Sequence, residues 1–401
     1  MDIKIAPSKA VGEITAPPSK SLAHRALIFG ALSEKSVIKN VAFSKDIEAT
    51  LNCLKSLGAS VLVNENTVTV GGLDFKNIPE NAKLPCFESG STLRFFLPLC
   101  MAAGKKITLF GAKRLFERPL TVYSEIAKEQ GIEFLKTEDS VTVCGNLKSG
   151  EYSVAGNISS QFITGLLIAL PLLSGNSRLE VTGKFESESY IDLTLQTMEE
   201  YGIIINRNGN VFEIKGNQKP KNSELTVEGD CSNAAFLEAF NYLGGNVAVK
   251  GLNQNTLQGD RVYKDIFPGL KNGVKEFDLS DCPDLAPVCF AVAAALDGGV
   301  FTGTARLKIK ESDRATAMQT ELSKFGINVF VEENRVIVEN GILRKPDKVL
   351  NSHNDHRIAM ALSLLCTLKG GTVAGAEAVS KSYPDFFSKI QSLGIDVNEV
   401  N

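Results

Sequence analysis

The sequence predicts an α/β protein with two domains, each of which holds three copies of one unit of about 70 residues. A segment in which a helix ends at glycine and leads into two strands recurs along the chain. A short polar run that opens an apolar helix precedes these segments. A length of 401 residues with 43% hydrophobic residues is enough to build the cores of two or three domains.

The helix–glycine–strand–turn–strand pattern occurs four times in full and once cut short. The segments begin LKSLGASVLV, AKEQGIEFLK, MEEYGIIINR, LSKFGINVFV and IQSLGIDV. Each glycine lies where the residue after a helix adopts the left-handed conformation at little cost, at Gly58, Gly131, Gly202, Gly326 and Gly394. The strands that follow alternate apolar and polar residues, with Asn, Glu, Asp or Gly in the turns.

The polar runs that open the apolar helices set the length of the repeat. They begin at residues 19, 89, 159, 231, 282 and 355, with steps of 70, 70, 72 and 73 residues and one shorter step after the fourth run. The short fourth unit ends GVKEFDLS and has no room for its second strand. The sixth unit stops after one strand, so we expect residues 3–14 to supply strands to the C-terminal half.

This repeat structure predicts the division of the chain. We expect one domain at residues 16–228 and a second, discontinuous domain that combines residues 1–15 with 229–401. The chain would cross between them near residues 15–18 and 227–230. The alternative is a single β/α solenoid of six repeats.

Composition argues against several classes of protein. The 43 Lys and Arg residues and 46 Asp and Glu residues give a net charge of −3, which is unlike a nucleic-acid coat or a polybasic membrane binder. The best candidate for a transmembrane helix, residues 162–173, is too short, and the N-terminus shows no signal-peptide pattern. The eight cysteines form no C-x-x-C pair, so we expect reduced thiols in a cytoplasmic protein.

Lysine and arginine recur near the expected helix starts, where the positive end of the helix dipole makes them unfavourable. These residues are Lys20, Arg25, Arg94, Arg118, Arg314, Arg357 and Lys381. A local rule that is broken at the same place in most copies indicates a functional site. We therefore expect small, multiply anionic ligands with phosphate and carboxylate groups. For any single helix start, capping by Ser, Thr, Asp or Pro is the simpler interpretation.

The sequence gives little support to a nucleotide or metal site. Neither G-x-x-x-x-G-K-[ST] nor G-x-G-x-x-G occurs. His353 and His356 with Asp355 could form a metal pair, but caps and anion contacts are the favoured interpretation, and we expect neither a metal nor a cofactor. Asp284 and Glu311 stand out as carboxylates among the cations. Either could be a plain cap or first-turn residue; in a dry cationic cleft they become candidates for proton transfer.

Nine short runs together resemble one protein family. In chain order they are PPSKSLAHRAL, ESGSTLRF, ERP, SSQF, SESYID, CPDLAP, KIKESDR, NDHRIAMAL and KSYPDFF. In these runs, which extend over essentially the full chain, the protein is similar to the 5-enolpyruvylshikimate-3-phosphate synthases, a family of enolpyruvyl transferases. The resemblance implies two inside-out α/β domains of three β-α-β-α-β-β repeats each, with the active site in the cleft between the domains.

The resemblance also implies a reaction of the shikimate pathway, carried out by a monomer without a cofactor. The enolpyruvyl group of phosphoenolpyruvate would pass to the 5-hydroxyl of shikimate 3-phosphate, with release of phosphate. Residues that match phosphoshikimate contacts are Lys20, Ser21, Arg25, Ser159, Ser160, Gln161, Ser187, Tyr190, Asp284 and Lys310. Residues that match phosphoenolpyruvate contacts are Lys20, Gly90, Arg118, Gln161, Arg314, Arg357 and Lys381. Asp284 matches the acceptor of the hydroxyl proton, and Glu311 with Lys20 matches the groups that move the proton at C3.

The sequence departs from the family pattern at two positions that bear on the predicted site, and two other functions are alternatives. Glu88 stands where many members have Asn, and Arg306 where some have an Asn that contacts phosphoshikimate, so neither joins the predicted site. UDP-N-acetylglucosamine enolpyruvyl transferase shares the fold and donor, but usually carries a reactive Cys in the loop that corresponds to residues 113–118, which here has none. A non-catalytic anion-binding relative would be expected to have lost Asp284, Glu311 or Lys20.

Overall fold

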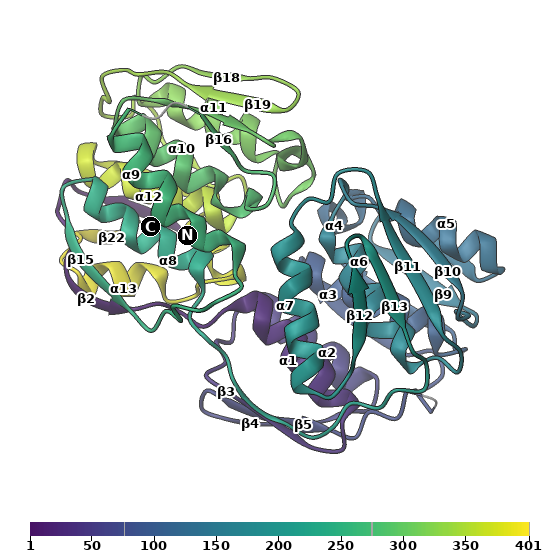
Figure 1. The fold of residues 1–401 in the computed structure, drawn as a ribbon. Coiled ribbons are helices and arrows are strands. Elements are labelled where there is room, and N and C mark those ends of the chain that lie inside the picture. Colours follow the sequence, from purple (N-terminus) through teal and green to yellow (C-terminus); the bar gives the residue numbers. More distant parts are fainter. Residues whose placement is uncertain (76, 274–275, 401) are drawn as a thin grey trace. The chain divides into compact units, whose positions relative to one another are not determined.

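A computed structural model describes residues 1–75, 77–273 and 276–400. The chain divides into two compact units (Figure 1). The continuous unit is Pro18–Glu228, and the discontinuous unit combines Met1–Pro17 with Gly229–Asn401. The sequence predicts crossovers near residues 15–18 and 227–230, and the division falls after Pro17 and after Glu228.

The part of the continuous unit that the structure describes contains three four-stranded sheets with one common strand order. In each sheet the first two strands are parallel, and an antiparallel hairpin completes the sheet. The sheets are β14 (Glu224–Thr226), β3 (Ser36–Lys39), β5 (Thr67–Gly71) and β4 (Ser60–Asn64); β6 (Lys83–Phe87), β7 (Ile107–Gly111), β9 (Ser140–Cys144) and β8 (Glu133–Lys136); and β10 (Glu151–Ala155), β11 (Ser177–Thr182), β13 (Val211–Ile214) and β12 (Ile205–Asn208). The first repeat takes its leading strand, β14, from the end of the unit, which hydrogen-bonds the two ends of the unit together.

In its described residues, the discontinuous unit contains two sheets of four strands and one of two. They are β20 (Leu350–Asn351), β21 (Gly371–Ala374), β1 (Asp2–Ile5) and β22 (Val397–Val400); β16 (Glu276–Asp278), β17 (Gly299–Thr302), β19 (Arg335–Val338) and β18 (Val329–Val331); and β15 (Asn246–Lys250) with β2 (Val11–Thr15). β1 lies between β21 and β22, and β2 pairs with β15. The prediction that the N-terminal segment supplies strands to the C-terminal half is confirmed.

The prediction for the end of the fourth repeat is wrong. We expected a strand of that repeat in residues 273–280, of which 274–275 lie outside the described residues. Residues 276–278 form β16, which pairs in parallel with β17 and so leads the sheet of the fifth repeat. Within the described part of the chain, the sheet of the fourth repeat consists of β15 and β2.

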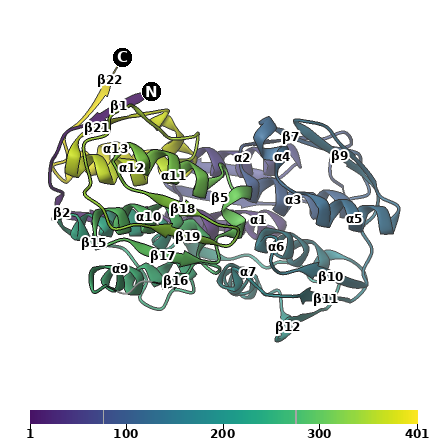
Figure 2. The same ribbon diagram turned by 90° about the horizontal axis from the view of Figure 1, so that it is seen from above.

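The first helix of each repeat is buried on nearly all sides, because its residues are apolar around the whole circumference. These helices are α1 (Lys20–Leu32), α3 (Gly90–Ala102), α6 (Ser160–Ala169), α8 (Cys231–Ala239), α10 (Ala286–Ala295) and α12 (His356–Lys369). They form the core of each unit with the sheets outside them, and in Figure 2 the sheet of β1, β21 and β22 lies over α12 and α13. The predicted inside-out α/β fold is confirmed.

A second set of helices completes the repeats. They are α2 (Lys45–Ser56), α4 (Lys113–Glu117), α5 (Thr121–Gln130), α7 (Glu188–Glu200), α9 (Tyr263–Lys271), α11 (Arg314–Lys324) and α13 (Phe386–Ser392). The described residues also form the 3-10 turns η1 (Leu170–Leu172), η2 (Phe240–Tyr242), η3 (Gly259–Val262), η4 (Pro283–Leu285), η5 (Ala305–Ile309) and η6 (Ala376–Lys381). Within the residues described, every helix is too short or insufficiently apolar to cross a membrane.

Local signals set the helix ends as the sequence predicts. The five glycines after the helices have φ between 69° and 98°, the left-handed region that glycine tolerates. The side chains of five N-cap residues accept backbone N–H groups at the starts of the first helices, namely Ser19, Ser89, Ser159, Asp230 and Asp355. These caps place the predicted site residues in or near the first turns.

Candidate active site

Lys20 begins α1, and a carboxylate from the next helix binds its amine. Ser19 caps α1 by accepting the N–H of Leu22 at 3.4 Å, which makes Lys20 the first helical residue. Nζ of Lys20 donates to Oδ2 of Asp46 at 2.6 Å, and Asp46 lies in the first turn of α2. The cation expected at the start of α1 is therefore present, and Asp46 fixes its position.

Arg25 lies in the second turn of α1 and is 3% exposed. Its guanidinium donates to Oγ1 of Thr194 at 2.8 Å and to Oγ1 of Thr164 at 3.4 Å. It also donates to the backbone carbonyls of Ser21 at 2.7 Å and Tyr190 at 2.9 Å. Burial lowers the pKa of Arg25 to about 10, so the side chain stays charged at neutral pH. These four acceptors are neutral and orient the guanidinium without cancelling its charge.

The start of α3 brings a glycine against two arginines. A β-carbon at Gly90 would lie 2.6 Å from NH1 of Arg118 and 2.9 Å from NH1 of Arg94. NH1 of Arg94 donates to Oε1 of Gln161 at 3.1 Å, and Nε2 of Gln161 donates to Oγ of Ser91 at 3.0 Å. Gly90, Arg118 and Gln161 therefore lie in one group, which Arg94 connects. Glycine is needed at position 90 because a side chain there would displace the two arginines.

The remaining predicted residues of the continuous unit lie at the starts of α6 and α7. Ser159 caps α6, and Ser160 is the first, buried residue of that helix. Ser187 is buried immediately before α7 with a left-handed φ of 58°, and Tyr190 lies in the first turn. The prediction that these residues occupy helix starts is confirmed.

Buried hydroxyls tie the first three helices of this unit together. Nδ1 of His24 is 2.7 Å from Oγ1 of Thr50, which is 2.8 Å from Oγ1 of Thr92. The Thr92 hydroxyl donates to Oγ of Ser89 at 2.8 Å. Burial lowers the pKa of His24 well below its usual value, so the imidazole is neutral. The network fixes the relative positions of α1, α2 and α3, which carry Lys20 and Gly90.

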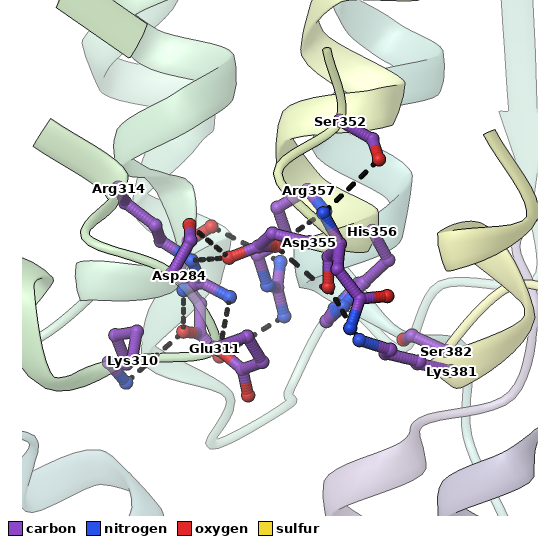
Figure 3. A network of polar contacts seen from close by, with 12 residues as sticks. Asp284, Lys310, Glu311, Arg314, Ser352, Asp355, His356, Arg357, Lys381 and Ser382 are labelled. Carbon is purple, nitrogen blue, oxygen red and sulfur yellow. Dashed lines mark hydrogen bonds and ion pairs between the residues drawn. The ribbon is translucent and has the colours of Figure 1, made fainter. Parts of the chain in front are cut away.

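In the discontinuous unit, three cations surround Asp284 (Figure 3). Oδ1 of Asp284 accepts from NH1 of Arg314 at 2.7 Å and from Nζ of Lys310 at 3.2 Å. Its Oδ2 accepts from NH2 of Arg357 at 3.1 Å. Burial acts to raise the pKa of Asp284, but Arg357, Lys310 and Arg314 together hold it well below the usual range. Asp284 is therefore an ionised carboxylate, and 21% of its side chain is exposed.

Arg314 joins three carboxylates. Its side chain is 1% exposed, and besides Asp284 it donates from NH2 to Oε2 of Glu311 at 2.8 Å and from Nε to Oδ2 of Asp355 at 2.9 Å. Burial acts to lower the pKa of Arg314, but Asp355, Glu311 and Asp284 raise it. Oδ1 of Asp355 also accepts the backbone N–H of Arg357 at 2.9 Å, so one carboxylate caps α12 and positions α11.

Two lysines approach this cluster from 3-10 turns. Lys310 follows η5, and burial lowers its pKa although Asp284 acts to raise it. Lys381 is the last residue of η6, and its Nζ donates to the backbone carbonyl of Asn354. Both side chains are mostly buried, so a ligand that contacts them would be held away from bulk water.

Three predicted site residues do not lie where the sequence placed them. Glu311 precedes Asp313, the cap of α11, and so lies outside the first turn of that helix. Arg118 follows α4 in an extended conformation, because the next residue is Pro119 and disfavours a helical residue before it. Lys381 ends η6 well before α13. Lys20, Arg314 and Arg357 do lie in first turns, as predicted.

The predicted site residues fall into two groups, one in each unit. The continuous unit holds Lys20, Ser21, Arg25, Gly90, Arg118, Ser159, Ser160, Gln161, Ser187 and Tyr190, and the discontinuous unit holds Asp284, Lys310, Glu311, Arg314, Arg357 and Lys381. The sequence did not reveal Asp46 and Asp355 as ion-pair partners of these groups. Each had a visible local signal as a first-turn or capping residue, but its cation partner is 26 or 41 residues away.

The metal alternative finds no support in the described ranges. Within residues 1–75, 77–273 and 276–400, no group of three or more His, Cys, Asp and Glu side chains could hold a metal ion. Nε2 of His353 is 3.0 Å from Oε1 of Glu321, whereas Nδ1 of His356 is 3.8 Å from Oδ1 of Asp355. The two histidines therefore contact different carboxylates.

Comparison with known proteins gives one consistent family. The sequence profile of the family EPSP synthase (3-phosphoshikimate 1-carboxyvinyltransferase) matches residues 5–272 and 264–390. The chain is 42% identical to the 3-phosphoshikimate 1-carboxyvinyltransferase of Clostridium kluyveri and 41% identical to that of Clostridium novyi, in each case over 99% of this chain and 98% of the relative. Two solved structures of EPSP synthase from Acinetobacter baumannii have the same fold, with TM-scores of 0.79 and 0.81 at 23% and 22% identity; they cover 99% and 100% of this chain and 100% of each structure.

Proposed function

Because this chain belongs to the EPSP synthase (3-phosphoshikimate 1-carboxyvinyltransferase) family, we propose that the residue groups described in each unit carry out the reaction of that family. The protein is a transferase of the shikimate pathway of aromatic amino-acid biosynthesis. It moves the enolpyruvyl group of phosphoenolpyruvate to shikimate 3-phosphate and releases phosphate. The family and activity predicted from the sequence are confirmed.

The observation that carries the assignment of residues is the ionised Asp284 among Lys310, Arg314 and Arg357. Taking one carboxylate and three cations largely out of water has a desolvation cost, so this cluster favours a functional over a purely structural role. Titratable groups with strongly shifted pKa values gather at functional sites. We assign Asp284 as the acceptor of the proton from the 5-hydroxyl of shikimate 3-phosphate.

The acceptor substrate is assigned mainly to the continuous unit. Arg25 retains its positive charge, and the starts of α1, α6 and α7 offer N–H groups and hydroxyls for a phosphate and a polyol ring. The proposed contacts are Lys20, Ser21, Arg25, Ser159, Ser160, Gln161, Ser187 and Tyr190, with Asp284 and Lys310 from the other unit.

The donor substrate is assigned to cations of both units. In the continuous unit, Gly90 leaves room for the guanidinium of Arg118 at the start of α3, where backbone N–H groups can also bind an anion. The proposed contacts for phosphoenolpyruvate are Lys20, Gly90, Arg118, Gln161, Arg314, Arg357 and Lys381. A planar guanidinium binds a carboxylate or phosphate with two parallel hydrogen bonds, which suits the two anionic groups of this ligand.

The cations around Asp284 link donor binding to proton transfer. They favour the ionised form of Asp284 and thereby make it a weak base. When phosphoenolpyruvate binds Arg314 and Arg357, it takes over hydrogen bonds that now end on Asp284, so the pKa of Asp284 rises. Asp284 then accepts the hydroxyl proton as the oxygen attacks C2 of phosphoenolpyruvate.

The second proton moves at C3. We assign Lys20 as the group that supplies it and Glu311 as the group that orients or relays it, because Glu311 accepts a hydrogen bond from Arg314 and is poorly suited to donate a proton itself. C3 becomes a methyl group in the tetrahedral intermediate. Loss of phosphate from C2, with return of one proton from C3, restores the double bond in the product.

The test of the acceptor assignment is phosphate release from phosphoenolpyruvate, measured with shikimate 3-phosphate and, separately, with UDP-N-acetylglucosamine. We expect turnover with shikimate 3-phosphate and none above background with the nucleotide sugar. Turnover with the nucleotide sugar would assign the chain to the sister reaction, and binding of both anions without turnover would indicate a non-catalytic relative.

We also propose a cytoplasmic monomer that needs no cofactor. All eight cysteines are free in the structure, seven of them buried, which suits a reducing compartment. Light scattering of the purified protein tests the monomer, and activity assayed before and after treatment with a chelator tests whether a metal ion is needed.

A further inference from the structure

Helix α11 binds the segment that leads into α12 at two points. At the start of α11, Nε of Arg314 donates to Oδ2 of Asp355 at 2.9 Å. Seven residues later on the same face, Oε2 of Glu321 accepts the backbone N–H of Asn351 at 2.9 Å. The segment 351–355 is thus held at each end by one side chain of α11.

Glu321 is a buried carboxylate with several donors around it. Its side chain is 1% exposed, and it accepts from Nζ of Lys324 through both oxygens, at 2.9 and 2.7 Å. Oε1 of Glu321 also lies 3.0 Å from Nε2 of His353. Burial acts to raise the pKa of Glu321, but His353, Lys324 and the Asn351 N–H lower it, so the carboxylate is ionised. No predicted step of the reaction uses this residue.

The segment that Glu321 binds is strained. His353 and Asn354 are consecutive non-glycine residues with φ of 51° and 53°, a region that non-glycine residues adopt only at an energetic cost. The surrounding contacts hold this turn in place. Oδ1 of Asn351 accepts the N–H of His353 at 2.7 Å, and Oγ of Ser352 accepts the N–H of Asn354 at 3.2 Å.

The turn carries groups that the proposed donor site needs. The carbonyl of Asn354 accepts a hydrogen bond from Nζ of Lys381, and the next residue, Asp355, binds Arg314 and caps α12 at Arg357 (Figure 3). The backbone conformation of Asn354, which includes its left-handed φ, therefore sets the direction of the carbonyl that accepts from Lys381. Relaxation of the turn would move Lys381 and the start of α12 together.

We propose that Glu321, acting through His353, is a positioning residue for the donor substrate: it holds the left-handed turn that aims Lys381 and Arg357 at phosphoenolpyruvate. The inference rests on the proposed assignment of these two cations to phosphoenolpyruvate. Glu321 itself touches no reacting atom. Misplacement of a substrate-binding group by about 1 Å lowers rates up to 10²-fold, so the contact has a measurable consequence.

Three substitutions at His353, whose side chain is 31% exposed, separate the contact from the strain. His353→Gln keeps a donor for Glu321, His353→Gly removes the donor but adopts the left-handed conformation freely, and His353→Ala removes the donor and retains the strain. We expect the KM for phosphoenolpyruvate to rise on the order of tenfold in His353→Ala, less in His353→Gly and less than threefold in His353→Gln. The KM for shikimate 3-phosphate should change less than twofold in all three.

Glu321→Gln provides a second test, with Asn328→Ala as the matched control. Glu321→Gln keeps the size of the side chain and removes its charge, so we expect the same selective rise in the KM for phosphoenolpyruvate. Asn328→Ala removes an exposed bond to Glu339 in the same repeat and should leave both KM values unchanged. Thermal unfolding of each variant reports whether it is folded.

Several outcomes decide between the claims. Equal rises in both KM values, or unchanged KM values in folded His353→Ala and Glu321→Gln, would overturn the positioning role. The role would also be overturned if the KM for phosphoenolpyruvate rose as much in His353→Gln as in His353→Ala. A selective rise in the KM for shikimate 3-phosphate would leave the positioning role intact and overturn the assignment of Lys381 and Arg357 to phosphoenolpyruvate.

Discussion

Arg25 of the continuous unit and Arg314 of the discontinuous unit have different kinds of partner. Arg25 donates to two hydroxyls and two backbone carbonyls, whereas Arg314 donates to three carboxylates. A neutral acceptor orients a guanidinium and leaves its charge available, while a carboxylate offsets that charge. An anion that binds Arg25 gains the full attraction of its charge, and one that binds Arg314 must take this arginine over from Asp284 and the neighbouring carboxylates.

This difference matches two different tasks. The acceptor substrate needs to be bound and oriented, and a standing positive charge in a buried setting suffices for that. The donor substrate must also change the chemistry of the site. Because Arg314 and Arg357 contact Asp284 and are also the proposed contacts of the donor, we expect donor binding to alter the basicity of Asp284.

The largest effect is expected for Asp284→Asn. Loss of a positioned base lowers turnover about 10²–10⁴-fold, so kcat should fall by that factor. The KM for phosphoenolpyruvate should stay constant or fall, because asparagine carries no charge that competes for Arg314 and Arg357. Steady-state kinetics with both substrates checks this, with the exposed Asp297→Asn at the other end of α10 as control. A rise in the KM for phosphoenolpyruvate as large as the fall in kcat would mean that Asp284 organises the cations and is not the base.

Arg25→Ala should give the next largest effect, and on the other substrate. Removal of a charge-assisted contact costs about 1.5–3 kcal/mol, which should appear mainly as a higher KM for shikimate 3-phosphate. Arg25→Lys keeps the charge without the forked geometry and should lose less. Equal losses for both substrates would contradict the division between the two units. Since both variants change the donors to Thr194 and Tyr190, thermal unfolding should be measured alongside.

Gly90→Ala should have a smaller effect than Arg25→Ala, and it should affect mainly the KM for phosphoenolpyruvate. The added β-carbon would lie 2.6 Å from NH1 of Arg118, so the guanidinium must move, and the KM for phosphoenolpyruvate should rise about tenfold, or ~1.4 kcal/mol. The KM for shikimate 3-phosphate should change little. Gly341→Ala, at an exposed position without a left-handed φ, serves as control. An unchanged KM for phosphoenolpyruvate in Gly90→Ala would remove Arg118 from the donor site.

The smallest effect concerns a second carboxylate near Asp284. Burial and the nearby charge of Asp284 raise the pKa of Asp260 to about 6, although Arg357 opposes the shift. The folded chain therefore binds this proton more tightly than the unfolded chain, and the contribution to stability is lost as pH rises from about 4 through 6. Asp260→Asn should therefore raise the free energy of unfolding at pH 8 and not at pH 4. Denaturant unfolding at both pH values checks this; an equal change at the two would rule out the ionisation of Asp260 as the cause.

Much of the fold could be predicted because it depends on local signals. Glycines after helices, caps before helices and the alternating pattern of strands are each signals that act within a few residues. The last repeat stops after one strand, which predicted that the N-terminal segment supplies the strands β1 and β2. The error at β16 has a physical reason too: a strand between two repeats carries no local mark of which sheet it joins, and its parallel partner β17 lies beyond a helix.

The site was less predictable where tertiary contacts decide it. The motifs located the cations and Asp284, but the helix starts expected for Glu311 and Lys381 are displaced by the 3-10 turns η5 and η6. The pairing of Arg314 with Asp355 joins residues 41 apart, and in the sequence Asp355 is indistinguishable from an ordinary cap. Which cation offsets which carboxylate is fixed by packing of the buried helices.

The most direct test of the account follows the ionisation of Asp284 itself. Carbon-13 NMR of aspartate side-chain carboxyls, with the Asp284 signal assigned through Asp284→Asn, can be recorded against pH in the free protein and in its complex with shikimate 3-phosphate and an inert analogue of phosphoenolpyruvate. We predict that Asp284 shows no titration from pH 4 to pH 8 in the free protein, and that its pKa moves upward in the complex because the analogue takes over Arg314 and Arg357. A pKa that stays equally low in the complex would contradict the claim that donor binding turns Asp284 into the base.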